Sequence, residues 1–241
     1  MKLYLSSYKI GNQEAVLVDM VGKGGVITLI PNAIDFIDNK EIVEGTGKTA
    51  YEISLAKDID KLKSLGFEVE ILDLRQYFGK EEALQERMSS VKSVYVRGGN
   101  AFLLLKAFEE SGFGKVLEAR KSDPEFVYAG YSAGVVVLAP SLKGIDKVDD
   151  PNIKVEGYKD GIIWEGLGIL KYSFAPHYDP EWKTKDKPHP ESEKIDQVIQ
   201  FFQDNGIEYV GMKDGEVLVI DTKTGMAIYY GLEGIKTGPE K

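Results

Sequence analysis

The chain has 241 residues, of which 43% are hydrophobic and 29% charged, enough apolar material for one sizeable core. The absence of cysteine excludes disulfides, thiolate metal sites, iron–sulfur clusters and a cysteine nucleophile. The formal charge of −9 argues against partners such as nucleic acid or anionic membranes. Since only two histidines are present, chemistry that needs imidazole must use His177 or His189.

The first half of the chain alternates apolar runs with segments of helical periodicity. The runs that predict strands are residues 2–6, 25–31, 67–74, 93–96 and 125–129. The segments that predict helices are residues 49–65, 81–90 and 101–110. Strands separated by helices predict βαβ units, and hence an α/β fold with a mostly parallel, doubly wound sheet.

After Pro140 the pattern changes. Residues 141–168 are polar and glycine-rich, which predicts an excursion of loops and hairpins. A strand at 171–175, a helix at 191–203 and strands at 209–212, 216–221 and 227–230 are then predicted. Because no linker or repeat interrupts the chain, residues 1–241 are expected to form one catalytic domain.

The first residues lack the apolar stretch of a signal peptide, and no 18 apolar residues run together, so a cytoplasmic location is expected.

Residues 130–134, with the sequence GYSAG, lie between a predicted strand and an apolar segment. A serine on a strand-to-helix turn projects its hydroxyl above the edge of the sheet, which makes Ser132 a candidate nucleophile. The N–H group of Ala133 would then donate to an oxyanion at the start of the helix. The alternative is a glycine-rich turn in which Ser132 only caps a helix.

Residues 97–100, with the sequence RGGN, also follow a predicted strand and precede a helix. In a catalytic interpretation the Gly99 N–H group is the second oxyanion donor, facing Ser132 from a neighbouring strand end. In a structural interpretation Asn100 is simply the N-cap of the helix. A phosphate-binding loop is a third alternative, but the Lys-Ser/Thr pair of such loops is missing.

A serine nucleophile needs a base and a carboxylate that orients it. His177 follows the strand predicted at 171–175, whereas His189 lies between two prolines in a charged loop, where a surface histidine is ordinary. Asp214, in a turn after the strand at 209–212, fits the carboxylate, and Asp179 is the alternative. The resulting order of serine, histidine and aspartate differs from the α/β-hydrolase order, in which histidine comes last.

Taken together, these segments resemble the dipeptidase E family of serine peptidases, which is related to the cyanophycinases. The matching pieces are residues 3–7, 28–31, 96–102, 104–106, 131–134, 148–152, 175–178 and 211–215. The resemblance implies a three-layer α/β/α fold of the class I glutamine amidotransferase type. It also implies a cofactor-free Ser-His-Glu triad, with amides of Gly99 and Ala133 at the oxyanion. The implied activity is removal of a residue or dipeptide from the N-terminus of small peptides, with aspartate first in the best-known members.

The sequence departs from this family at three positions. Asp214 stands where the family usually has glutamate, and Arg97 replaces a common glycine, which narrows or charges the mouth of the site. Glu191 aligns with an arginine of the aspartate-preferring members, and a carboxylate there would repel an aspartyl side chain. Aspartyl specificity is therefore doubtful, and a neutral or basic first residue is the alternative. Arg97, Asn100 and Glu191 are the expected substrate-binding residues.

The sequence thus predicts a serine exopeptidase that acts on small peptides through Ser132, His177 and Asp214, without a cofactor or metal ion. Two alternatives remain open at this point. The same three residues would also serve an esterase or amidase, and a non-catalytic binding module would keep the fold without serine reactivity. The oligomeric state is left open.

Overall fold

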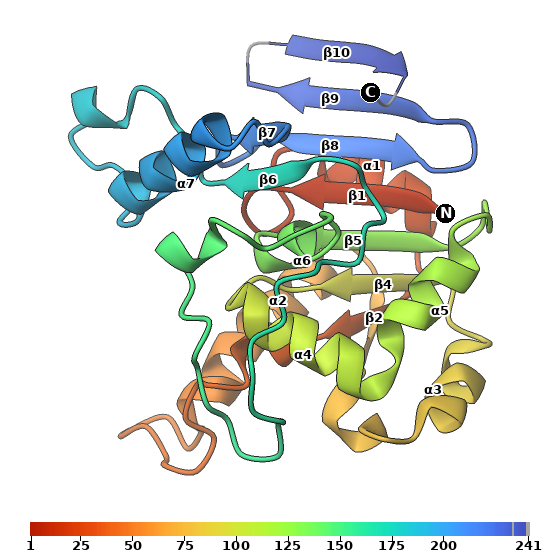
Figure 1. Cartoon of the computed structure of the whole chain (residues 1–241). Coiled ribbons are helices and arrows are strands. Elements are labelled where there is room, and N and C mark those ends of the chain that lie inside the picture. Colours follow the sequence, from red (N-terminus) through yellow and green to blue (C-terminus); the bar gives the residue numbers. More distant parts are fainter. Residues whose placement is uncertain (233, 240–241) are drawn as a thin grey trace.

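The computed structural model describes residues 1–232 and 234–239 and contains two sheets (Figure 1). The strands of the large sheet are β1 (Lys2–Ser6), β2 (Val26–Ile30), β3 (Glu68–Ile71), β4 (Ser93–Val96), β5 (Val127–Tyr131), β8 (Val217–Asp221), β9 (Met226–Gly231) and β10 (Gly234–Pro239). The small sheet pairs β6 (Ser173–Pro176) with β7 (Tyr209–Met212). The α-helices are α1 (Glu14–Val21), α2 (Ala50–Ser64), α3 (Glu81–Met88), α4 (Ala101–Ser111), α5 (Phe113–Arg120), α6 (Ala133–Val136) and α7 (Ser192–Asp204).

The large sheet has the strand order β10-β9-β8-β1-β5-β4-β2-β3. The neighbouring strands β1, β5, β4, β2 and β3 run parallel. Strands β8, β9 and β10 extend the sheet beyond β1 with antiparallel pairs. Both β4 and β5 are buried along their whole length, as their uninterrupted apolar sequences require. The predicted α/β class with a mostly parallel sheet is therefore confirmed.

Helices cover both faces of the large sheet and give the molecule three layers (Figure 1). Side chains of β1 alternate between the two faces: Leu3 and Leu5 join one core and Tyr4 the other. The first core is closed by α3 to α7 and the second by α1 and α2. Among the described residues, no helix combines the length and hydrophobicity that crossing a membrane requires.

Some elements differ from the sequence prediction. The strands β6 and β7 lie where strands were predicted, but they form a sheet of their own beside the large one. Helices α1 and α5, of eight residues each, were not predicted. The predicted strand at 67–74 ends at Ile71, since Asp73 caps a short 3₁₀ helix, η2 (Leu74–Tyr77), by accepting a hydrogen bond from the Arg75 amide.

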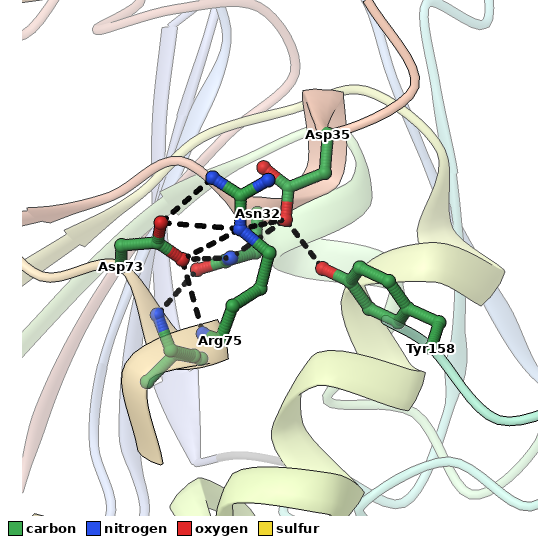
Figure 2. Close-up of polar contacts among 6 residues, drawn as sticks. Asn32, Asp35, Asp73, Arg75 and Tyr158 are labelled. Carbon is green, nitrogen blue, oxygen red and sulfur yellow. Dashed lines mark hydrogen bonds and ion pairs between the residues drawn. The ribbon is translucent and has the colours of Figure 1, made fainter. Parts of the chain in front are cut away.

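A buried polar network fixes the loop that follows β2, where a second 3₁₀ helix, η1 (Asn32–Ile34), begins (Figure 2). The Asn32 side chain is fully buried; it donates to Asp35 at 2.7 Å and to Asp73 at 3.0 Å, and it accepts from the Leu74 amide at 3.1 Å. Such fully bonded networks specify one loop conformation, because a buried polar group without a partner is costly.

Two further side chains complete this network. Arg75 forms ion pairs with Asp73 at 2.7 Å and with Asp35 at 3.4 Å, and the Tyr158 hydroxyl donates to Asp35 (Figure 2). Burial raises the pKa of Asp35, although the bonds from Tyr158 and Asn32 oppose this. Since Tyr158 belongs to the excursion 141–168, the network ties that excursion to the ends of β2 and β3.

The network reaches the loop 97–100 through η1. The carbonyl oxygen of Ala33 accepts a hydrogen bond from the Asn100 amide at 2.8 Å. Gly99 has φ +151°, and a Cβ at this position would collide with the same carbonyl oxygen. The glycine therefore lets two loops from neighbouring strand ends pack against each other.

We predict that Asn32→Ala lowers the free energy of unfolding by about 2–5 kcal/mol, because the Leu74 amide and two carboxylates each lose a buried hydrogen bond. Urea denaturation monitored by circular dichroism measures this loss. Asn152→Ala is the matched control, since Asn152 is exposed. Equal midpoints for the two variants would contradict a stabilising role of the network.

Candidate active site

Ser132 lies between β5 and α6 in a strained backbone conformation, with φ +48° and ψ −114°. Such angles are unfavourable for a residue with a side chain and are typical of a nucleophile elbow. The close approach of α6 to β4 maintains the turn: a Cβ on Gly134 would lie 2.5 Å from the Val96 carbonyl oxygen. The Tyr128 hydroxyl also donates to the Gly134 carbonyl at 2.6 Å. These contacts hold the Ser132 hydroxyl in one position.

His177 follows β6 and also has a positive φ, +63°. Its imidazole Nε2 lies 3.2 Å from the Ser132 Oγ, and its Nδ1 lies 2.7 Å from the Asp214 Oδ1. The imidazole is almost buried, with 9% of the side chain exposed. With Nδ1–H donating to the carboxylate, Nε2 carries the lone pair that faces the serine hydroxyl.

Ser7, directly after β1, connects the large sheet to the small one. Its Oγ accepts a hydrogen bond from the His177 amide at 2.7 Å. Its single hydroxyl proton is shared between two acceptors, Asp214 Oδ1 at 2.9 Å and the Met212 carbonyl at 3.0 Å. Ser7 is fully buried. Burial alone would raise the pKa of Asp214, but hydrogen bonds from His177 and Ser7 hold this pKa below its ordinary value. Asp214 is thus an ionised acceptor at neutral pH.

The loop 97–100 lies directly beside Ser132. A Cβ on Gly98 would lie 2.8 Å from the Ser132 Cβ, so only glycine allows this approach. The Ala133 amide opens α6 and has no partner within that helix. Of the predicted oxyanion residues, Gly99 lines the same pocket as Ser132, and Ala133 follows Ser132 directly in the chain.

The three predicted substrate-binding residues have different surroundings. Asn100 caps α4, because its side chain accepts from the Leu103 amide at 2.9 Å and donates to the Asp150 carbonyl at 2.9 Å. Arg97 is buried and forms an ion pair with Asp58 of α2 at 3.1 Å. Glu191 precedes α7 and lines the pocket beside Ser132.

A pocket of about 350 Å³ opens above Ser132. Its lining includes Tyr8, Lys9, Lys57, Arg97, His177 and Glu191. Asn100 is not part of this lining, which fits the structural interpretation of that residue as an N-cap. The volume suits a small peptide or a similarly sized molecule.

His189 also lines this pocket, which differs from the prediction of an ordinary surface histidine. Its ring is half-buried and stacks on the ring of His177, with the centroids 4.5 Å apart and the planes 4° from parallel. The sequence offers little signal for this contact, because it depends on the path of the loop 178–191. The flanking Pro188 and Pro190 are the only local hint, since they restrict that loop.

His177, His189 and Asp214 place one ligand atom each within 4.8 Å of one another, the spacing of a possible metal site. In the two parallel rings, however, the in-plane lone pairs run side by side and do not converge on one point. A shared metal ion would require the stack to open. The arrangement therefore fits ring stacking better than metal coordination.

Two other carboxylates lie near the site. Asp179, the alternative partner of His177, forms ion pairs with Lys185 and, at 4.0 Å, with Lys213. The structure brings Asp214, and not Asp179, to the imidazole.

Burial raises the pKa of Asp149 to about 7, although the Ala101 amide donates to this carboxyl at 2.7 Å. Asp149 was part of a matching segment in the sequence, but no role was predicted for it.

Residues 11–228 match the model of peptidase family S51, and the chain belongs to this family. It is 28% identical over 136 residues to peptidase E of Streptomyces coelicolor, which covers 56% of the chain and 51% of the relative. It is 26% identical over 157 residues to a Drosophila melanogaster protein named "probable alpha-aspartyl dipeptidase", and this match covers 65% of the chain and 58% of the relative. The chain thus spans less than two thirds of either relative. The resemblance to the dipeptidase E family is confirmed by this membership and by the names of the two relatives.

Two solved structures share the fold. One is a protein of Listeria monocytogenes EGD-e provisionally described as a peptidase E, with a TM-score of 0.64, 20% identity and coverage of 100% of this chain and 98% of that one. The other is a peptidase from an acI-B1 Actinobacterium, with a TM-score of 0.62, 17% identity and coverage of 95% and 87%. At these identities the likeness concerns the fold alone.

We predict that Ser7→Ala lowers kcat/KM for a peptide substrate about 10-fold, which corresponds to roughly 1.4 kcal/mol on the barrier. The reason is that Asp214 and the His177 amide both lose a hydrogen bond that orients the imidazole. Steady-state kinetics at neutral pH measure the effect, and Ser64→Ala, at the exposed end of α2, is the control. Wild-type kinetics for Ser7→Ala would show that Ser7 does not orient the site.

Proposed function

We propose that the chain is a serine exopeptidase that hydrolyses N-terminal peptide bonds of small peptides through a triad of Ser132, His177 and Asp214. The observation that supports this most directly is the chain of contacts from Asp214 through the imidazole to the Ser132 hydroxyl, at 2.7 and 3.2 Å. Membership of peptidase family S51 and the peptidase and dipeptidase names of the relatives support the same reaction class.

In the proposed reaction, the Ser132 Oγ attacks the carbonyl carbon of the scissile bond while His177 Nε2 takes the hydroxyl proton. Asp214 accepts from Nδ1–H and stabilises the imidazolium that forms. The amides of Gly99 and Ala133 donate to the carbonyl oxygen as it becomes negative, each contributing about 2.7–4 kcal/mol by analogy with other oxyanion holes.

The tetrahedral intermediate then collapses. His177 gives its proton to the leaving amine, the C–N bond breaks, and an ester to Ser132 remains. A water molecule attacks this ester while His177 takes a proton from the water, and the acid is released as Ser132 regains its proton. The steps need no cofactor. In the net reaction, one peptide and one water molecule give an acid and an amine.

For the first residue of the substrate, we propose a neutral or basic side chain in preference to aspartate. Glu191 lines the pocket and would repel a carboxylate. Arg97 offers little charge to a substrate, because Asp58 neutralises it at 3.1 Å. Lys9 and Lys57 also line the pocket and favour an acidic group, so a substrate comparison decides which charge dominates.

We predict that Ser132→Ala lowers kcat by about 10⁴- to 10⁶-fold without changing the melting temperature appreciably. The rate falls because the nucleophile is lost. The melting temperature stays the same because alanine can occupy the same strained backbone conformation as serine. A fluorophosphonate probe followed by mass spectrometry of the digested protein tests the assignment directly. We expect one adduct on Ser132 in the wild type and none in the variant.

An adduct on another residue would contradict the triad, and an unreactive, folded wild-type protein would indicate a binding module. Hydrolysis of esters or simple amides without detectable hydrolysis of matched peptides would favour the esterase or amidase alternative. All three results come from the wild-type protein.

We predict that anilides of dipeptides that begin with lysine or alanine are turned over faster than the matched compound that begins with aspartate. The cause is the Glu191 carboxylate in the pocket, and the measurement is kcat/KM for the three compounds. Glu191→Gln should narrow the difference, since it removes the charge and keeps the shape. Fastest turnover of the aspartyl compound by the wild type would overturn this preference.

A further inference from the structure

His189 takes no part in the proposed proton transfers, yet its ring lies flat on the ring of His177. We propose that His189 is a positioning residue whose uncharged ring holds the catalytic imidazole against Ser132 and Asp214 and stabilises its protonated form. The catalytic part of this proposal rests on the proposed function, whereas the stacking and its electrostatic coupling do not.

Contacts with neighbouring rings restrict the orientation of the His177 imidazole. The His177 imidazole must keep Nε2 on Ser132 and Nδ1 on Asp214 at the same time, which allows little rotation about its χ2 bond. The His189 ring covers one surface of His177 at a centroid distance of 4.5 Å, and the Tyr8 ring contacts it at 5.8 Å with the planes at 66°. The two contacts restrict the rotation that the hydrogen bonds alone would permit.

The charge of His189 also affects the protonated form of His177. During attack by Ser132 the His177 ring becomes a cation, and the π-face of a neutral aromatic ring attracts a cation. A protonated His189 would instead repel it. The protonation state of His189 therefore decides whether the stacked ring stabilises or destabilises the His177 cation.

The surroundings of His189 keep it neutral. The Glu191 amide donates to its Nδ1 at 3.3 Å, which places the proton of the neutral ring on Nε2. Burial lowers the pKa of His189, and the neighbouring His177 charge lowers it further, while the carboxylates of Asp214 and Glu191 act in the opposite direction. The net shift is downward, so the ring is uncharged at neutral pH.

The chain contains only two histidines, so ¹⁵N-histidine NMR reports each ring separately. In the wild type without substrate we expect His189 to titrate below about 6.5, with its neutral form protonated on Nε2. In His177→Gln the pKa of His189 should rise, because a protonated imidazole can no longer form beside it. An unchanged pKa of His189 in that variant would refute the coupling, whether or not the chain is a peptidase.

Kinetics test the catalytic part. His189→Ala removes the stack and should lower kcat about 2- to 30-fold, the range expected for loss of a cation–π contact, with KM changed less than about twofold. His189→Phe keeps a neutral ring and should restore most of the lost kcat. Equal kcat values for the two variants, or a change in KM alone, would overturn the positioning role.

The two experiments separate the possible failures. If the NMR result holds but no peptide or anilide is hydrolysed by the wild type, the stack exists and the proposed function is wrong. If hydrolysis occurs and His189→Ala has wild-type kcat, the function stands and the positioning role is wrong.

Discussion

Among the described residues, three that are not glycine have a positive φ, and two of them, Ser132 and His177, face each other where the two sheets meet. Each such conformation costs about 1–3 kcal/mol, so the surrounding packing must supply that energy. For Ser132 the compensation is the contact of α6 with β4 at Gly134. For His177 it is the hydrogen bond from its amide to Ser7. The reactive geometry therefore depends on packing some distance from the reacting atoms.

The division into two sheets explains why Ser7 is central. The large sheet carries Ser132 at the end of β5, whereas His177 and Asp214 follow the two strands of the small sheet. Without a connection, a small shift of one sheet would separate the imidazole from the serine. Ser7 lies at the end of β1, next to β5, and bonds both segments of the small sheet. One hydroxyl thereby fixes the register between the parts of the site.

The sequence predicted features whose causes are local. Buried parallel strands need continuous apolar runs, and a nucleophile elbow needs small residues around Ser132, so both leave a readable pattern. The separate β6–β7 sheet and the stack of His189 on His177 depend on the path of long loops, which periodicity does not encode. Ser7 lay within a matching segment, but nothing in its neighbours indicates a hydrogen bond to a residue 205 positions away.

The turn between β7 and β8 brings the aspartate at position 214 to the imidazole of His177. That turn is held on three sides: the Asn12 amide donates to the Gly215 carbonyl at 2.8 Å, the Lys213 amide to Glu216 at 2.6 Å, and Ser7 to Met212 at 3.0 Å. Held in this way, Asp214 reaches Nδ1 at 2.7 Å, and a longer carboxylate would have to fold back to make the same bond.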